Sequence, residues 1–287
     1  MSEEGSPISD SIDASKGFTQ VDRAPDPAMF IASMDATAQW TAVQRLRAWE
    51  AERLRARAGD AVLDVGCGTA DVLNDLALRV GDSGSAIGVD ASQEMLAVAS
   101  SRAQALGATS TFQIGDAQAL PFADASFDVV RSERTLQWVQ DPARAVAEMV
   151  RVLRPGGRVC ITDTDWRTLL IDHPSAELVG RFTGAIEVLR GDQLSIGGRL
   201  VNMLRDSRVV AVEAAAETHM WLQWNPDESI APPGMVPLRF LAAQLVGQRL
   251  LDASDADAMV EQFEQTARDD RFFTSLTMFA AAGTKPG

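Results

Sequence analysis

The sequence predicts an α/β fold, built on a mostly parallel sheet of seven strands with helices on both faces and a helical lid inserted around the sixth strand. Two observations support this prediction. Short apolar runs alternate with longer helical segments over residues 59–165, which is the pattern of a parallel sheet with right-handed crossovers. The runs are apolar on both faces, as expected for strands that helices cover on both sides.

Five predicted strands and three predicted helices make up this first part of the chain. The helix over 142–153 has the clearest start, because Asp141 suits the N-cap and Pro142 the first helical position. It ends before Pro155 and Gly156, residues that stop a helix. The expected strands are 61–65, 86–90, 110–114, 127–131 and 157–162, and the other two helices are 71–80 and 92–106.

The alternation changes after residue 163. Two more strands, 208–216 and 272–282, are expected to rejoin the first sheet, which leaves the helical insertions around them as a substrate lid. The helices expected there are 174–190, 197–206, 235–250 and 254–269. The predicted organisation is a disordered tail over 1–16, N-terminal helices over 17–58, a cofactor-binding core over 59–165, a helical lid over 166–207 and 217–271, and closing strands over 208–216 and 272–283.

Composition and charge restrict the class of partner. The chain has 287 residues, 46% of them hydrophobic, and a formal net charge of −14, which argues against a nucleic acid or an anionic membrane as partner. No apolar run approaches the length of a membrane span and no signal peptide is apparent, so we expect a cytoplasmic enzyme. Two cysteines and two histidines give no metal-ligand spacing. We therefore expect a small-molecule substrate and no metal, and a homodimer stays open.

The segment over residues 61–70 holds the main binding motif. A short buried strand contains Asp64, and Gly66 and Gly68 then let the backbone turn tightly and approach a ligand. A helical pattern begins at Asp71. The glycines therefore lie between the carboxyl end of a strand and the start of a helix, where open α/β sheets bind ligands.

This loop differs from a dinucleotide-binding loop at one position. Asp71 stands where Gly-x-Gly-x-x-Gly has its third glycine, and its carboxylate would repel a pyrophosphate. Together with Asp64 it favours a cationic ligand, S-adenosyl-L-methionine (SAM), over NAD. Asp90, at the end of the second strand, suits the ribose hydroxyls of either cofactor. Asp116, after the third strand, suits an exocyclic amine.

Four short motifs follow one another in the first half of the chain. They are Val-Leu-Asp-Val-Gly-Cys-Gly-Thr from Val62, Val-Asp-Ala-Ser-x-x-Met-Leu from Val89, Gly-Asp-Ala-x-x-Leu-Pro-Phe from Gly115 and Leu-Arg-Pro-Gly-Gly from Leu153. In this order and spacing the chain resembles the class I SAM-dependent methyltransferases, in the small-molecule branch related to ubiquinone and menaquinone biosynthesis. The resemblance spans about residues 21–283 and implies a Rossmann-like fold. Ala70 departs from the family, which often has glycine there.

The resemblance also implies roles along the cofactor. Gly66, Cys67 and Gly68 would contact the methionine part of SAM, and Asp64 would bond near its amino group. Asp90 resembles the acid that binds the ribose in this family. The remaining implied contacts are Ala91 and Met95 beside the adenine, Asp116 at the adenine amine, Ala117 against the ring, and Arg131 and Ser132 beside the methionine and the substrate mouth.

The sequence offers three candidate bases. A base is needed only when the acceptor is a hydroxyl or a carbon acid, since methyl transfer otherwise depends on positioning and on excluding water. His173, Asp165 and Glu133 follow strands that end near the expected cleft. Each has a plainer alternative. His173 precedes Pro174 at a helix start, Asp165 suits a backbone cap, and Glu133 suits a solvated loop or a pair with Arg134.

Aromatic residues suggest the kind of acceptor. Four tryptophans could form the wall of a pocket for an aromatic or isoprenoid substrate, or they could pack in the core: Trp138, Trp166, Trp221 and Trp224. His219 lies beside the last two in the sequence and is expected to be structural. The leading hypothesis is a SAM-dependent methyltransferase acting on a secondary-metabolite or quinone-like acceptor, with oxygen favoured over carbon or nitrogen. The alternatives are a SAM-binding cyclase or rearrangement enzyme on the same fold, a non-catalytic SAM-binding partner subunit, and a nicotinamide dehydrogenase.

Overall fold

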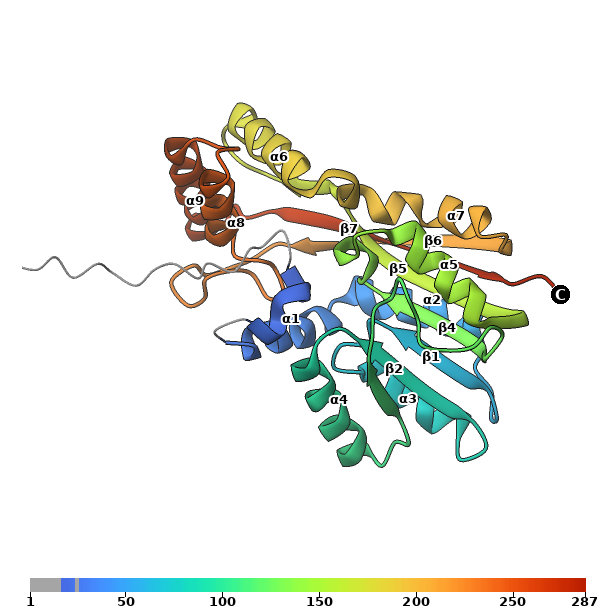
Figure 1. The fold of residues 1–287 in the computed structure, drawn as a ribbon. Coiled ribbons are helices and arrows are strands. Elements are labelled where there is room, and N and C mark those ends of the chain that lie inside the picture. Colours follow the sequence, from blue (N-terminus) through green and yellow to red (C-terminus); the bar gives the residue numbers. More distant parts are fainter. Residues whose placement is uncertain (1–16, 24–25) are drawn as a thin grey trace, which may run out of the picture.

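The structure, a computed structural model, describes residues 17–23 and 26–287, so the tail expected over 1–16 lies outside the described residues. Figure 1 shows a sheet that crosses the molecule with helices on both of its faces. The strands are β1 Ala61–Val65, β2 Ser85–Asp90, β3 Thr111–Ile114, β4 Phe127–Glu133, β5 Leu153–Ile171, β6 Val210–Trp221 and β7 Thr274–Thr284. The α-helices are α1 Ala28–Ala38, α2 Thr41–Leu54, α3 Asp71–Val80, α4 Gln93–Leu106, α5 Pro142–Val152, α6 Ala176–Arg190, α7 Ile196–Asp206, α8 Leu238–Gly247 and α9 Ala253–Arg268.

The sheet has the strand order β3-β2-β1-β4-β5-β7-β6 over the described part of the chain. Strands β1 to β5 pair in parallel, and β7 runs antiparallel between β5 and β6. This confirms the predicted mostly parallel sheet of seven strands and the return of the last two strands to it. The order reverses between β1 and β4, and open sheets of this kind bind ligands at such a switch point.

Alternate residues of the central strands pack against opposite helical layers. Val62 and Val129 belong to the cluster formed with α2, α3 and α4, whereas Leu63 and Val130 belong to the cluster formed with α5 and α7. All four side chains are fully buried. This two-sided burial explains why the strands read as continuous apolar runs.

A third group of helices covers the carboxyl ends of the parallel strands. We call α6, α8 and α9 the helical cap, and their buried side chains form one cluster with α2 and with β7. Figure 1 shows α8 and α9 beyond that end of the sheet, near α1. Phe182, Met259 and Phe263 are among its fully buried residues.

Two strands are longer than the sequence predicts. The expected lid over 166–207 and 217–271 begins with strand residues, because β5 continues to Ile171 and β6 to Trp221. β6 stays paired with β7 up to Trp221, and β5 resumes its pairing with β7 at Leu170 after an interruption that follows Asp165. Both strands end opposite Thr274, so the ladder extends past the rest of the sheet. Helix α7, also expected in the lid, instead packs on the sheet through Leu200. The boundaries of the lid are corrected accordingly.

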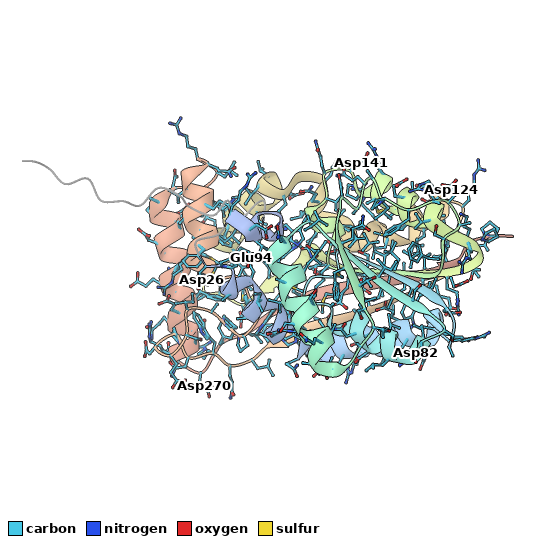
Figure 2. All side chains as sticks on the ribbon, turned by 60° about the horizontal axis from the view of Figure 1, so that its bottom comes forward. Asp26, Asp82, Glu94, Asp124, Asp141 and Asp270 are labelled. Atoms are coloured by element: carbon cyan, nitrogen blue, oxygen red, sulfur yellow. The ribbon has the colours of Figure 1, made fainter. Side chains whose placement is uncertain are left out.

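Acidic side chains are distributed over the whole surface. Figure 2 shows Asp82, Asp124 and Asp270 projecting outward from separate parts of the molecule, and all three are exposed. The negative charge is therefore spread over several elements. Within the described residues, none of the helices combines the length and the apolar character that crossing a bilayer requires.

The central strands should be the most sensitive part of the core. We expect Leu63→Ala to lower the free energy of unfolding by about 2–5 kcal/mol, because it leaves a cavity between β1 and α5. Leu78→Ala is the matched control, since Leu78 is 54% exposed on α3, and it should change stability by less than about 0.5 kcal/mol. Urea unfolding followed by circular dichroism measures both, and equal effects would contradict this account of the core.

Candidate functional site

A cavity of about 540 Å³ lies at the carboxyl ends of the parallel strands. At one end, which we call the strand-end floor, Gly66, Gly68, Asp90 and Asp116 line it. The other end is apolar and is built by residues before α2, from β5, β6 and β7, and around α8. We call it the aromatic chamber, and its lining residues are Trp40, Trp166, Leu169, Trp221, Met235, Val236, Leu238, Leu241 and Leu276.

The loop after β1 requires its two glycines. Gly66 has φ +73° and Gly68 has φ +52°, values that side-chain-bearing residues rarely adopt. A Cβ on Gly66 would lie 2.1 Å from Thr135 Oγ1, and one on Gly68 would lie 2.3 Å from Met34 Cε. Ala70, where the family often has glycine, also has a positive φ of 62°. The chain therefore keeps a left-handed backbone there at a cost of about 1–2 kcal/mol.

Asp90 connects the glycine loop to the end of β2. Its Oδ2 accepts the backbone N–H of Gly68 at 2.8 Å, and its Oδ1 accepts that of Ser92 at 2.9 Å. Burial raises the pKa of Asp90 despite these bonds. Each carboxylate oxygen keeps a further lone pair for another donor. The expected cofactor residues Ala91, Met95, Asp116 and Ala117 line the same floor.

Four expected cofactor residues lie beneath the floor and do not line the cavity: Asp64, Cys67, Arg131 and Ser132. Asp64 Oδ2 accepts from Arg131 Nη1 at 2.7 Å, and Ser132 Oγ donates to the carbonyl of Val65 at 2.8 Å. The sulfur of Cys67 is packed against Gly88. These side chains point away from the cavity because each one contacts an ionic partner, a backbone carbonyl or the core. Their effect on a ligand is therefore through the position of the loop.

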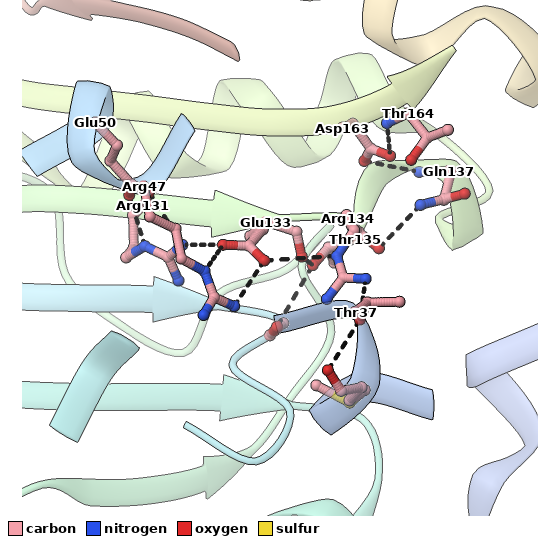
Figure 3. A network of polar contacts seen from close by, with 12 residues as sticks. Thr37, Arg47, Glu50, Arg131, Glu133, Arg134, Thr135, Gln137, Asp163 and Thr164 are labelled. Atoms are coloured by element: carbon pink, nitrogen blue, oxygen red, sulfur yellow. Dashed lines mark hydrogen bonds and ion pairs between the residues drawn. The ribbon is translucent and has the colours of Figure 1, made fainter. Parts of the chain in front are cut away.

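Arg131 is the centre of a buried ionic network (Figure 3). Its Nε donates to Glu50 Oε1 at 2.6 Å, and its Nη2 donates to Glu133 Oε2 at 3.0 Å. Arg47 donates two further hydrogen bonds to the Glu133 carboxylate, of 2.8 and 2.9 Å. Burial raises the pKa of Glu50 and of Asp64, and Arg131 opposes that effect. The network links α2 to the ends of β1 and β4.

Glu133 lines the cavity but is held in this network. It is the last residue of β4, and its side chain is 8% exposed. Burial acts to raise its pKa, but Arg47, Arg134 and Arg131 together lower the pKa of Glu133 to about 2. A carboxylate so stabilised in its charged form is a weak base. The environment favours the ion-pair alternative for Glu133 over the solvated loop acid and over the base.

The other two candidate bases lie away from the cavity. The buried Asp165 carboxylate accepts from the backbone N–H of Gly198 at 3.0 Å and from Arg167 Nη2 at 2.8 Å. Burial acts to raise the pKa of Asp165, and these bonds lower it below its usual range. His173 Nδ1 accepts from the N–H of Ser175 at 3.1 Å, beside the start of α6, and burial lowers the pKa of His173. Both arrangements match the plainer alternatives of a cap and a helix start.

The indole rings of the chamber also hold the segment before α8. Trp40 and Trp221 both donate Nε1–H to the carbonyl of Pro233, each at 3.1 Å. His219 stacks on Trp40 with ring centroids 4.3 Å apart, as a structural role predicts. Trp138 and Trp166 line the cavity, whereas Trp224 packs against Phe263 and Phe272 outside it.

Sequence reasoning overlooked Arg134 as a lining residue. Among the described residues that line the cavity, it is the one with a positive charge. Its φ of 55° is left-handed, and its Nη1 donates to Thr37 Oγ1 at 2.6 Å. Its buried Nε lies 3.5 Å from Glu133 Oε1 without a hydrogen-bond partner. A basic residue directly after the fourth strand was the signal that could have identified it.

Asp71 has a different surrounding from the one expected. Its carboxylate accepts from Arg102 Nη1 at 2.8 Å, Arg102 also binds Asp35 at 2.8 Å, and none of the three lines the cavity. Because the Asp71 carboxylate faces Arg102 and does not line the cavity, it cannot repel a pyrophosphate there at close range. The choice of cofactor therefore depends on the rest of the motif set.

Comparisons with known proteins agree with that motif set. Residues 63–161 match the family model described as a methyltransferase domain. An uncharacterized 37.1 kDa protein from a transposon of Streptomyces fradiae is 35% identical over 77% of this chain. The 2-phytyl-1,4-beta-naphthoquinone methyltransferase of Arabidopsis thaliana is 46% identical over 38% of this chain. The alignments span 65% and 43% of the lengths of these two relatives.

A solved structure shares the fold. The YcgJ protein of Bacillus subtilis matches 85% of this chain and 99% of its own, with a TM-score of 0.55 and 21% identity. At this identity the likeness concerns the fold alone.

The network around Glu133 should make stability depend on pH. The pKa of Glu133 is lower in the folded chain than in the unfolded one, so its contribution is complete above about pH 4.5 and is lost as the pH falls towards 2. We expect Glu133→Gln to be less stable than the wild type by about 3 kcal/mol at pH 7. Urea unfolding at pH 7, 4 and 3 should show this difference shrinking. A difference that stays constant down to pH 3 would contradict the charge-based account.

Proposed function

We propose that this chain, whose residues 63–161 are a class I SAM-dependent methyltransferase domain, methylates a small, largely apolar acceptor of the quinone-like or secondary-metabolite type. Hydroxyl oxygen is the favoured acceptor atom over carbon or nitrogen. The observation that supports this best is that a single cavity is lined both by the strand-end floor and by the aromatic chamber. The resemblance to a naphthoquinone methyltransferase supports the same acceptor class.

The residues of the floor fit SAM. The glycine loop leaves room where a Cβ would collide, and the two carboxylate oxygens of Asp90 would accept the ribose hydroxyls. Asp116, after β3, would accept from the adenine amine. The strand order supports a position of the methionine part over β1 and β4, where Arg134 would hold its carboxylate. When bound, SAM supplies a methyl group activated by a sulfonium.

The chain itself would act mainly by positioning. The aromatic chamber would hold a flat or prenylated acceptor against the floor and keep water out, which supports a displacement reaction. Of the cavity-lining carboxylates, Glu133 is committed to arginines, and Asp90 and Asp116 lie at the floor. An acceptor whose hydroxyl ionises easily, such as a quinol or phenol, needs the least help from a base. Among hydroxyl acceptors, a quinol or phenol is therefore favoured over an alkyl alcohol.

The direct test is product mass. Purified protein is incubated with SAM and a panel of quinols, phenols and matched amines, and products are analysed by mass spectrometry. A gain of one methyl group on a hydroxyl supports the proposal, and Asp90→Ala should lose turnover. A product of unchanged mass would instead support a cyclase, and SAM binding without any product would support a partner subunit.

We expect Arg134 to recognise the carboxylate of SAM. We expect the wild type to bind SAM about 10–100-fold more tightly than decarboxylated SAM, because one charge-assisted contact is lost. Arg134→Met should remove most of this preference, and Arg134→Lys should keep part of it. Isothermal titration calorimetry measures the affinities, with Arg205→Met on the exposed side of α7 as control. A preference that survives in Arg134→Met would assign the carboxylate to another residue.

A further inference from the structure

An arginine outside the cavity lies against two indole rings of its wall. Arg190 is the last residue of α6, and its Cζ lies 4.1 Å from the ring centroid of Trp166 and 5.0 Å from that of Trp138. Both rings line the cavity. Within the described residues, the guanidinium makes no hydrogen bond and no ion pair at contact distance. Its five N–H donors are thus available to a ligand.

The charges around Arg190 leave it poorly compensated. Asp163 is the carboxyl group whose charge favours the cationic form of Arg190. Burial raises the pKa of Asp163 to about 7, so this carboxyl group is only partly charged at neutral pH. Asp163 is also occupied by the backbone N–H groups of Thr164 and Gln137, at 2.8 and 3.2 Å. Burial lowers the pKa of Arg190 to about 10. Arg190 therefore stays cationic without a committed anion.

Arg190 lines a second hollow together with two more arginines. Arg144 donates from Nε to the carbonyl of Gln118 at 2.8 Å, and Arg199 donates from Nη1 to the carbonyl of Asp192 at 3.2 Å. Neither of them pairs with a carboxylate among the described residues. The full lining of this hollow, which we call the arginine groove, is Gln118, Gln140, Asp141, Pro142, Ala143, Arg144, Arg190, Asp192, Gln193 and Arg199.

The two carboxylates of the groove do not neutralise it. Asp141 Oδ1 accepts the backbone N–H of Arg144 at 3.0 Å as the N-cap of α5. Asp192 forms no ion pair with the three arginines at contact distance. The groove therefore has an excess of positive charge on a chain whose net charge is −14. It also meets the cavity, because Gln118 and Gln140 line both hollows.

We propose that the arginine groove binds an anionic group, a carboxylate or a phosphate, through Arg190. Two sources can supply such a group: the polar end of the acceptor, whose apolar part would occupy the cavity, or a free ion. The first source rests on the proposed function, whereas the second does not. A planar guanidinium held against indole rings suits bidentate recognition of either group.

Calorimetric binding separates the two sources. The full-length protein is titrated with inorganic phosphate, with 1-naphthoate and with the neutral 1-naphthalenemethanol. We expect Arg190→Met to weaken anion binding about 10–100-fold and to leave naphthalenemethanol binding unchanged. Arg190→Lys should bind the anions with intermediate affinity, because lysine keeps the positive charge but cannot donate two parallel hydrogen bonds from a planar group. Arg181→Met is the matched control on the same helix, since Arg181 pairs with Glu177 and Asp255.

Each outcome decides the proposal. Phosphate binding that depends on Arg190 supports a free-ion site, and naphthoate binding alone supports an acceptor-borne group. The proposal is overturned if neither anion binds, or if Arg190→Met retains full affinity. Circular dichroism and the affinity for S-adenosylhomocysteine show whether the variant is folded. Because these titrations involve no turnover, failure of the methyltransferase assay leaves their result intact.

Discussion

The ion pairs around the buried Arg131 are the interaction on which the rest of the site depends. One guanidinium binds Glu50 from α2, Asp64 from β1 and Glu133 from its own strand. Three buried carboxylates without this arginine would repel one another and lose their hydration. The network thus fixes the two strand ends between which the sheet reverses its order. The glycine loop, the position of Arg134 and the floor of the cavity all follow from that placement.

The fold was predictable because it depends on local patterns. Two-sided apolar runs gave the strands β1 to β4 nearly to the residue, and Asp141 with Pro142 gave the start of α5. The extensions of β5 and β6 were not predictable, because they exist only through pairing with β7, which lies about a hundred residues further along the chain than β5. A strand that a distant partner stabilises leaves little periodic signal in its own sequence.

The candidate site was predictable on the side where backbone geometry controls it. Gly66, Gly68, Asp90 and Asp116 stand at strand ends, and the topology of a parallel sheet brings strand ends together. The roles of the acidic residues were harder to predict, because the sequence does not distinguish a carboxylate that faces the cavity from one that faces an arginine. Asp64 pairs with Arg131 and Glu133 with Arg47, residues far away in the chain that sequence spacing does not reveal, whereas Asp165 pairs with Arg167 two residues further on. Arg134 was overlooked because a basic residue beside Glu133 reads equally well as its ion-pair partner.

The extension of β5, β7 and β6 beyond the rest of the sheet makes the two walls of the aromatic chamber unequal in how firmly they are held. Trp221 is paired with Thr274 in the ladder of β6 and β7, whereas Trp166 lies in the stretch of β5 between Asp165 and Leu170 where the pairing with β7 is interrupted. The β6 part of this wall therefore cannot move without breaking backbone pairing. The opposite wall is attached differently, since the segment before α8 is fastened at Pro233 by two indole N–H groups. Two side-chain hydrogen bonds cost far less to break than a strand ladder. The segment before α8 is therefore the less firmly held wall of the aromatic chamber.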